Sequence, residues 1–528
     1  MNPTEPDNSN RAPRTREASP PSLRGDAWDI RDQLKEDANE GREDSDPPIV
    51  VRDGRTDHTA KGRAGSQCAQ STDARGRNVP KQSISSTLGA LNRKAERDKS
   101  HRFQSLYRLI DKQMLYDCFS RLKRKAAPGV DGMTVAAYEK ELDENLSSLL
   151  ERLIGKRYRA RAVRRHYIPK ADGKQRPLGI PALEDKIVQL AAARILESIH
   201  EADFSERSVG YRKGRPGARQ SSYQLGRELY DGTFRWMVEA DIRSFFDEVD
   251  HDWLIRMIEQ RVKDRAFVGL IRKWLKAGVL EPDGTVPWEP EKGTPQGGII
   301  SPVLANIYLH YVLDLWIEKK LSREYRGKVI FMRYADDIIV GFERKDDAVD
   351  YLRRLPERLG KFSLRLAKEK SGLVKFNRWE PDDSGRFTFL GFEFYWSRTQ
   401  RNRNHTVVKR KTAKKKYRAS LRAMKDWIRK ARSWPLKLIL SSLRRRLRGY
   451  WNYYCVKGNS LMTWKYYRAV CELMFKWLNR RSQRKSYTWA KFGDLWGRAW
   501  QLPRPSVVEK VGRTAQGEFV LEPTPSVR

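Results

Sequence analysis

The chain has 528 residues, and its 106 Lys and Arg side chains outnumber 67 Asp and Glu side chains, which gives a formal net charge of +39. Such an excess predicts a polyanionic partner, with nucleic acid as the first candidate. The sequence has no apolar run near the roughly 18 residues of a membrane span and no signal-peptide pattern, so we expect no membrane association and a location in the cytosol or nucleoid. Its four cysteines form no CxxC pair, which argues against a disulfide framework and a zinc ribbon.

Residues 1–85 are rich in Pro, Gly, Ser and charged residues and poor in aromatic ones. Because a segment of this composition cannot bury enough apolar surface to offset its chain entropy, we expect a disordered leader. From about Arg102 to residue 165, apolar residues recur at three- and four-residue spacings, which predicts helices. Between them, residues 126–132 form a turn-rich loop whose glycines would let the backbone approach another surface closely.

Residues 167–181 predict two short strands joined by an Asp-Gly turn. Lys170 and Arg176 would lie on opposite arms of this hairpin and could converge on phosphate groups. An exposed basic hairpin without a ligand is the alternative interpretation. A helix is expected after Pro181, because proline suits the first turn of a helix.

Three acidic residues come from two apolar segments. Residues 234–242 form a strand-like run around Asp241, and residues 331–340 predict a tight β-hairpin with Asp336 and Asp337 at its turn. Neighbouring carboxylates repel each other and need a compensating cation, and hard divalent ions such as Mg²⁺ prefer carboxylate oxygens. An isolated Asp-Asp pair is more often a solvated turn. The third carboxylate, delivered from a second strand, favours a two-metal site.

Two aromatic rings and a constrained loop accompany these acids. Phe245 and Phe246 follow Asp241 closely, and core packing is their default interpretation. Residues 293–302 form a loop rich in glycine and proline that enters a helix, where Gln296 could either contact a ligand or cap the helix.

The C-terminal half of the chain carries most of the positive charge. Residues 364–371 contain two lysines that could reach one site, and residues 387–394 alternate like a pair of half-buried strands. Between residues 401 and 500 the net charge is +26, and this stretch also holds eight of the sixteen tryptophans. Helical spacing of its apolar residues predicts a basic helical bundle rather than a disordered tail. Aromatic residues interleaved with arginine favour a nucleic-acid surface over a solvated charge run.

The ordered motifs of the chain resemble those of reverse transcriptases. In chain order they read Asp241-Ile-Arg-Ser-Phe-Phe-Asp, Thr294-Pro-Gln-Gly-Gly, Tyr334-Ala-Asp-Asp, Lys-Glu-Lys370-Ser and Phe389-Leu-Gly-Phe. Two further stretches, Pro128-Gly-Val-Asp-Gly and Arg448-Gly-Tyr-Trp-Asn-Tyr-Tyr, resemble more narrowly the reverse transcriptase/maturases encoded by bacterial group II introns. The resemblance covers roughly residues 90–500.

This resemblance implies an α+β fold of the right-hand polymerase type, with fingers, an antiparallel palm sheet and an α-helical thumb. The implied divisions are a disordered leader (1–85), an N-terminal helical extension of the fingers (86–165), the fingers and palm (166–395), a helical thumb/maturase domain (396–485) and a basic C-terminal tail that binds DNA or RNA (486–528).

The resemblance also implies roles for residues that match family motifs. Asp241, Asp336 and Asp337, together with the Ile242 carbonyl, would hold two Mg²⁺ ions, and Lys370 would donate a proton to the leaving pyrophosphate. Such a site transfers a nucleotide to the primer 3′-hydroxyl, and the protein supplies fixed negative ligands for it.

Further matches surround this centre. Residues expected to contact the incoming deoxynucleoside triphosphate are Lys170 and Arg176 at the phosphates, Phe246 as a gate against a ribose 2′-hydroxyl, and Gln296 in the pocket. Residues expected to steady the primer end are Phe389, Leu390, Gly391 and Phe392. Residues expected to bind RNA are Arg444, Arg445, Arg448, Tyr450, Trp451 and Tyr454.

The implied function is RNA-directed DNA synthesis from an RNA template and a DNA primer, in the bacterial cytosol or nucleoid. The chain would also bind its parent group II intron RNA to promote splicing and would support intron mobility into target DNA. Many relatives end in a zinc-dependent nuclease, yet beyond Trp500 this chain has neither Cys nor His. We therefore expect that it does not cut target DNA itself and that primers come from elsewhere, for example from nascent strands at replication forks.

Two other functions remain compatible with the sequence. The first is a splicing maturase that only binds RNA and has little polymerase activity, although the three intact carboxylates and the Gln296 loop weigh against it. The second is a domesticated bacterial reverse transcriptase that serves phage defence.

Overall fold

The computed structural model describes residues 83–169, 175–284, 292–294, 297–399, 404–481, 486–509, 511–513 and 519–521. All of them belong to one compact unit of the chain, residues 53–524. Lys170, Gln296 and nearly all of the expected leader lie outside the described residues. Within these residues, no helix is both long enough and apolar enough to cross a membrane.

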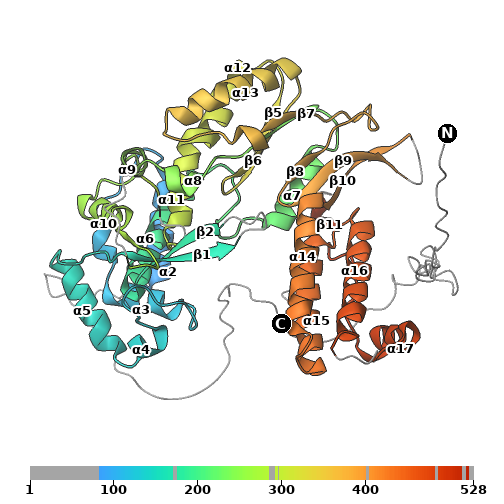
Figure 1. Ribbon diagram of the computed structural model, residues 1–528. Coiled ribbons are helices and arrows are strands. Elements are labelled where there is room, and N and C mark those ends of the chain that lie inside the picture. Colours follow the sequence, from blue (N-terminus) through green and yellow to red (C-terminus); the bar gives the residue numbers. More distant parts are fainter. Residues whose placement is uncertain are drawn as a thin grey trace, which may run out of the picture. The chain divides into compact units, whose positions relative to one another are not determined.

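Helices dominate the first part of the described chain, coloured blue to cyan in Figure 1. Their bounds are α2 (Ile84–Arg97), η1 (Tyr107–Leu109), α3 (Lys112–Ser120), α4 (Val135–Glu139), α5 (Leu142–Ile154) and α6 (Leu183–His200). Side-chain caps fix some of their starts, since Asp111 accepts a hydrogen bond from the Met114 backbone N–H at 2.7 Å. Helix α6 is buried along most of its length and packs against α2 and α3. It therefore forms the centre of this helical layer and begins two residues after Pro181.

The predicted hairpin is present beside these helices. Strands β1 (Val163–Pro169) and β2 (Gln175–Ile180) pair antiparallel, with Arg176 opposite Ile168. A short strand, β4 (Val279–Leu280), extends this sheet parallel to β1. The Asp-Gly turn expected between the first two strands falls in residues 170–174, outside the described part of the chain.

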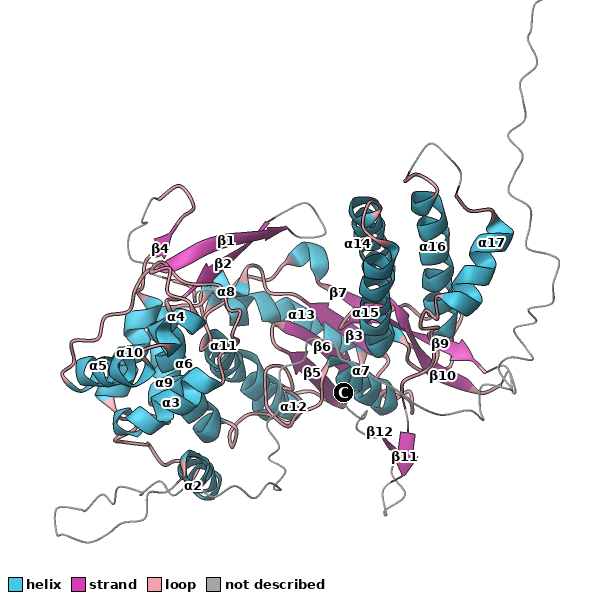
Figure 2. Ribbon diagram, turned by 90° about the horizontal axis from the view of Figure 1, so that it is seen from below, coloured by secondary structure: helices cyan, strands magenta, loops and turns pink. Residues whose placement is uncertain are grey.

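A second sheet of four antiparallel strands carries the three predicted carboxylates. Its order is β5 (Val329–Tyr334), β6 (Asp337–Phe342), β3 (Trp236–Ala240) and β7 (Gly372–Lys375), shown as arrows in Figure 2. Helix α13 (Lys345–Gly360) packs across three of these strands, and β8 (Phe387–Phe389) contacts β3 and β6. The helical elements around this sheet are α7 (Ala218–Glu228), α8 (Phe245–Glu248), α9 (His251–Glu259), α10 (Arg265–Leu275), α11 (Ser301–Leu309), the π-helical turns η2 (His310–Asp314) and η3 (Trp316–Leu321), α12 (Ser322–Glu324) and the 3₁₀ turn η4 (Lys368–Lys370).

The C-terminal part begins with strands and continues as helices. Strands β8, β9 (Phe392–Arg398) and β10 (Thr406–Thr412) form an antiparallel sheet. The helices that follow, orange to red in Figure 1, are α14 (Lys414–Ala431), α15 (Leu436–Tyr454), α16 (Ser460–Leu478), α17 (Trp489–Asp494) and the π-helical turn η5 (Leu495–Ala499). They share an apolar core of their own, to which Phe492, Trp496 and Trp500 contribute. A last antiparallel pair is β11 (Val511–Arg513) with β12 (Phe519–Leu521). The mixture of helices and mainly antiparallel sheets confirms the expected α+β class.

The loop at residues 126–132 is pressed against the start of α6. Lys186 donates to the Ala127 carbonyl at 2.6 Å, and the Arg164 guanidinium donates to the Pro128 carbonyl at 2.8 Å. A Cβ atom on Gly129 would lie 2.5 Å from the Ala182 Cα atom, a distance that packed atoms do not reach. Glycine therefore permits this close approach of two backbones, as the sequence predicts.

The substitution Gly129→Ala should destabilise the protein by about 1–3 kcal/mol, because the added methyl group meets backbone atoms that have little room to move. Urea unfolding followed by tryptophan fluorescence measures the change. Gly269→Ala is the matched control, since Gly269 lies within helix α10 and nothing lies within 4 Å of its Cβ position. It should stabilise the protein by about 0.5–1 kcal/mol. A neutral effect of Gly129→Ala would contradict the packing described here.

Candidate active site

Three acidic residues lie at the same end of the four-stranded sheet. Strand β3 pairs with β6 so that Ala240 lies opposite Ile338, which places the next residue, Asp241, in line with Asp337. Strands β5 and β6 pair up to Tyr334 and Asp337, so Asp336 occupies the two-residue turn between them. The register alone thus brings together acids that are about a hundred residues apart in sequence.

The turn that carries Asp336 has a strained backbone. Ala335 adopts φ 58°, a left-handed conformation that costs a non-glycine residue about 1 kcal/mol or more. Gly210 packs directly against this turn, because a Cβ atom there would lie 2.3 Å from the Ala335 nitrogen. The segment around Gly210 is joined to β5, since the Val209 N–H donates to the Arg333 carbonyl at 2.9 Å. A strained turn of this kind persists only where its surroundings hold it.

Arg333 supplies that support from inside the protein. Its side chain is fully buried and forms two hydrogen bonds with the equally buried Asp314 carboxylate, at 2.8 and 2.6 Å. It also donates to the Ala335 carbonyl at 2.9 Å and to the Asn306 side-chain oxygen at 3.0 Å. Asn306 in turn donates to the Gly210 carbonyl at 2.9 Å. One guanidinium therefore connects α11 and the π-helical turn η2 to the turn that carries Asp336.

The three carboxylates influence one another electrostatically. Burial raises the pKa of Asp336, and the Asp241 charge raises it further. Burial and the neighbouring Asp336 charge raise the pKa of Asp337 to about 6, whereas the nearby Leu390 N–H acts in the opposite direction. The Asp337 side chain is nevertheless accessible to solvent at the start of β6. It is therefore a group that is open on one side and surrounded by protein on the others, which suits a carboxylate that must receive a ligand.

Asp241 is held by the segment that leads into β7. Its backbone N–H donates to the Ser371 hydroxyl at 3.2 Å, and its carbonyl accepts from the Ala367 N–H at 2.8 Å. Its carboxylate pairs with the Lys370 ammonium group at 2.5 Å. Ile242 forms an isolated bridge with Leu366, so the backbone beside Asp241 is also fixed.

The three carboxylates are candidate ligands for a divalent metal ion. In the described part of the chain, no three His, Cys, Asp or Glu side chains converge closely enough to hold a metal ion, and Asp241 is directed toward Lys370 instead. The donor chemistry still suits a hard divalent cation, because the three carboxylates lie at the ends of adjoining strands and the Asp241 charge raises the pKa of Asp336. Reverse transcriptases in general use divalent metal ions.

Several groups that could contact a nucleotide surround the carboxylates. Arg176, on β2, is close enough to Asp336 to lower the pKa of that carboxyl. Phe246 packs edge-to-face on the buried ring of Phe245, and its carbonyl accepts from the Thr294 N–H at 2.7 Å. Gly297 lies against β2, where a Cβ atom would meet the Gly179 carbonyl oxygen at 2.8 Å. The loop that contains Gln296 therefore spans from Phe246 to the hairpin, although Gln296 itself lies outside the described residues.

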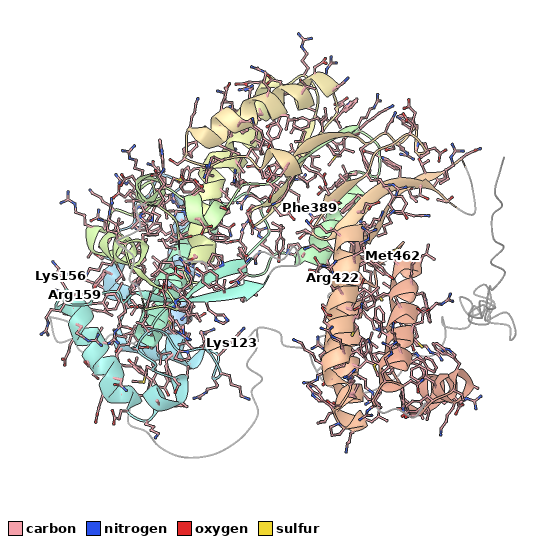
Figure 3. The ribbon with its side chains drawn as sticks, viewed as in Figure 1. Lys123, Lys156, Arg159, Phe389, Arg422 and Met462 are labelled. Atoms are coloured by element: carbon pink, nitrogen blue, oxygen red, sulfur yellow. The ribbon has the colours of Figure 1, made fainter. Side chains whose placement is uncertain are left out.

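The predicted primer-contact motif forms the turn between β8 and β9. Phe389, labelled in Figure 3, and Phe392 are buried, whereas Leu390 and Gly391 form the turn itself. The Leu390 N–H lies close enough to the Asp337 carboxylate to lower the pKa of that group, so this turn adjoins the acidic centre.

The residues predicted to bind RNA do not share one environment. Tyr450 and Trp451 are only 9% and 4% exposed and belong to the core of the C-terminal helices, so their rings are not available to stack on bases. Arg444 donates to the Trp500 carbonyl at 2.8 Å, and Tyr454 also packs against the core. Arg445 is exposed. The density of aromatic residues here thus reflects packing more than a surface for stacking.

Sequence reasoning missed two parts of the site. The buried pair of Arg333 and Asp314 depends on contacts between distant segments, and its only sequence signal is a polar residue within an apolar helical run. Tyr211 has φ 61°, is 52% exposed, and lies close enough to Asp336 for that charge to contribute to its raised pKa, behind the larger effect of burial. The glycine-rich stretch around Tyr211 is a signal that could have drawn attention to it.

Comparisons with known proteins agree with this geometry. The model of a family described as "Reverse transcriptase (RNA-dependent DNA polymerase)" matches residues 168–394. The protein YkfC of Escherichia coli (strain K12) is 32% identical over 340 residues, which cover 58% of this chain and 87% of YkfC. The chain belongs to the reverse transcriptase family. This reverse transcriptase is therefore an RNA-directed DNA polymerase, and its motif-based resemblance is confirmed.

Other relatives of this reverse transcriptase are intron proteins. The group II intron-encoded protein LtrA of Lactococcus lactis subsp. cremoris is 29% identical over 387 residues, which cover 62% of each chain. An uncharacterized 91 kDa protein in the cob intron of Schizosaccharomyces pombe is 33% identical over 239 residues, which cover 44% of this chain and 28% of that protein. The chain thus spans less than two thirds of LtrA.

The substitution Asp314→Ala should destabilise the protein by about 3–5 kcal/mol, because it leaves the buried Arg333 guanidinium without its carboxylate. Urea unfolding measures the loss. Asp494→Ala is the control, since the pair of Asp494 and Arg498 is 3.5 Å apart with side chains that are 62% and 88% exposed. That variant should change stability by less than about 1 kcal/mol. Equal effects of the two substitutions would show that Arg333 does not depend on Asp314.

Proposed function

We propose that this reverse transcriptase performs nucleotidyl transfer at Asp241, Asp336 and Asp337 and that it also binds a group II intron RNA to promote splicing and support intron mobility. The observation that carries the first part is the strand register that brings these three carboxylates to one end of the sheet. The second part is supported by the similarity to LtrA, whose name describes a group II intron-encoded protein.

Asp241, Asp336 and Asp337, with the Ile242 carbonyl, would hold two Mg²⁺ ions. When bound, such ions lower the pKa of the primer 3′-hydroxyl and stabilise charge on the leaving pyrophosphate. Lys370, now paired with the Asp241 carboxylate, would be released from it as the cations bind. Its ammonium group would then be placed to give a proton to the pyrophosphate.

The remaining residues would hold and select the nucleotide. Lys170 and Arg176 would grip the triphosphate, and the closeness of Arg176 to Asp336 supports this role. Phe246, fixed by the ring of Phe245 beneath it, would exclude a ribose 2′-hydroxyl. Gln296 would line the pocket, since its flanking residues contact Phe246 and the hairpin.

We assign a right-hand polymerase architecture to the described residues. Residues 86–165 would extend the fingers, residues 166–395 would form fingers and palm, residues 396–485 a thumb/maturase domain, and residues 486–528 a tail that binds DNA or RNA. The separate apolar core of the C-terminal helices supports a distinct thumb, and that core also includes Phe492, Trp496 and Trp500.

The outer face of α14 offers a surface for intron RNA. Four exposed basic residues follow one another at helical spacing along it: Arg418, Arg422, Lys425 and Arg429. Arg422 is labelled in Figure 3. Such a row can contact consecutive phosphates of a folded RNA. Template, primer and target DNA would be further polyanionic partners.

The substitution Asp336→Asn should lower primer extension on an RNA template at least about 1,000-fold, because the neutral amide cannot hold a cation as the carboxylate does. RNA affinity should stay within twofold of the parent protein, as measured by filter binding. Asp346→Asn is the control, because Asp346 is an exposed carboxylate on α13. This variant should extend primers at the parent rate. Extension by Asp336→Asn at the parent rate would refute the assigned centre.

Replacing Arg418, Arg422, Lys425 and Arg429 together by Gln should weaken binding to the group II intron RNA that flanks the coding sequence. It should also reduce the salt dependence of binding by roughly 0.7–0.9 in log K per log salt for each lost phosphate contact. Splicing assistance at low Mg²⁺ should be lost, while extension of a short annealed primer persists.

A matched control removes the same charge elsewhere. The exposed residues Lys319, Lys320, Arg323 and Arg326 can be replaced by Gln in the same way, and splicing assistance should then remain. Equal losses in the two variants would mean that only net charge matters. A coding sequence without flanking intron RNA would contradict the splicing proposal.

A further inference from the structure

A tyrosine of the C-terminal helices reaches the turn beside the catalytic carboxylates. Tyr453 lies near the end of α15, and its hydroxyl donates to the Leu390 carbonyl at 2.8 Å. The stretch around it, Arg448-Gly-Tyr-Trp-Asn-Tyr-Tyr, contains several residues that the resemblance predicts to bind RNA, but Tyr453 is not one of them.

The Leu390 turn needs support from its neighbours. Leu390 adopts φ 51°, which is unfavourable for a residue with a branched side chain, and Gly391 follows with φ 77°. The two backbone groups of Leu390 point to different partners. Its N–H lies close enough to the Asp337 carboxylate to lower the pKa of that group, and its carbonyl accepts from the Tyr453 hydroxyl. A change in the orientation of this one residue would therefore move the N–H away from Asp337.

The Tyr453 ring is itself held firmly. It stacks on the buried Phe392 ring, with centroids 5.5 Å apart and planes 12° from parallel. It also packs edge-to-face against Tyr454 at 4.8 Å. Burial raises the pKa of the Tyr453 phenol, so the hydroxyl remains a hydrogen-bond donor at neutral pH. A donor fixed by two aromatic neighbours can define the position of its acceptor.

We propose that Tyr453 is a positioning residue for nucleotide addition: its hydroxyl holds the strained Leu390 turn so that the Leu390 N–H fixes the orientation of the Asp337 carboxylate. This inference rests on the proposed role of Asp337 in catalysis. It gives the C-terminal helices a part in the geometry of the reaction centre, in addition to any contact that they make with nucleic acid.

A single-atom substitution tests this role. Tyr453→Phe keeps the ring and its stacking on Phe392 but removes the donor. The maximal rate of single-nucleotide addition, measured by rapid quench at saturating deoxynucleotide, should fall about three- to tenfold, as expected for one lost hydrogen bond. The apparent Kd for the nucleotide should stay within twofold, because the nucleotide contacts neither this hydroxyl nor the Leu390 turn in the proposal.

Tyr351→Phe is the control. Tyr351 is a buried tyrosine of α13, and its hydroxyl has no hydrogen-bond partner within the part of the chain that the structure describes. That variant should add nucleotides at the parent rate. The thermal midpoint of both variants is measured as well, and all rates are taken well below it, so that a loss of global stability does not alter the comparison.

Three results would overturn the proposal: a parental rate in Tyr453→Phe, an equal loss in Tyr351→Phe, or a weaker nucleotide affinity with an unchanged maximal rate. These results remain distinct from a failure of the proposed function. If Asp336→Asn is inactive while Tyr453→Phe is normal, only the positioning role is refuted. If Asp336→Asn extends primers normally, the catalytic assignment itself falls.

Discussion

The buried Arg333 guanidinium is the interaction on which the candidate site depends. A charge without water is tolerated only when its donors are satisfied, and here Asp314, Asn306 and the Ala335 carbonyl satisfy them. The same contacts join α11 and η2 to the turn that carries Asp336. This buried polar network therefore maintains the strained conformation of Ala335 from the interior of the protein, while the Asp337 side chain stays open to solvent.

Around this support, the site combines opposing charges. Neighbouring carboxylates contribute to the raised pKa values of Asp336 and Asp337, and basic groups such as Lys370, Arg176 and Lys416 lie near enough to offset part of this repulsion. Without a ligand, this cluster of like charges retains part of its repulsion. It suits a process in which cations and a triphosphate bind together, because the cations neutralise the carboxylates and the triphosphate neutralises the cations and the basic side chains.

Local patterns in the sequence were enough to predict the elements that carry the site. The hairpin around Asp336 and Asp337 and the strand before Asp241 follow from alternation and apolar runs within a few residues. The partners of Arg333 could not be predicted, since Asp314 and Asn306 are recognised only once distant helices and strands pack. Tyr450 and Trp451, which the resemblance predicts to bind RNA, lie in the core of the C-terminal helices. Aromatic residues among arginines occur both on surfaces that bind RNA and in the core of a basic helical bundle, and composition does not separate the two.

The ion pair between Arg410 and Glu509 has a consequence for how the chain folds during synthesis. Both side chains are buried, and the Glu509 carboxylate accepts two hydrogen bonds from Arg410 at 2.8 Å and one from the Lys457 N–H at 3.0 Å. Phe492, Trp496 and Trp500 complete the same region from the end of the chain. Because these contacts join residues nearly a hundred positions apart, the C-terminal helices cannot complete their core until residue 509 has left the ribosome. The sheet with the three carboxylates emerges well before that point, so a nascent chain would carry these acids before the C-terminal helices, which supply Tyr453, are complete.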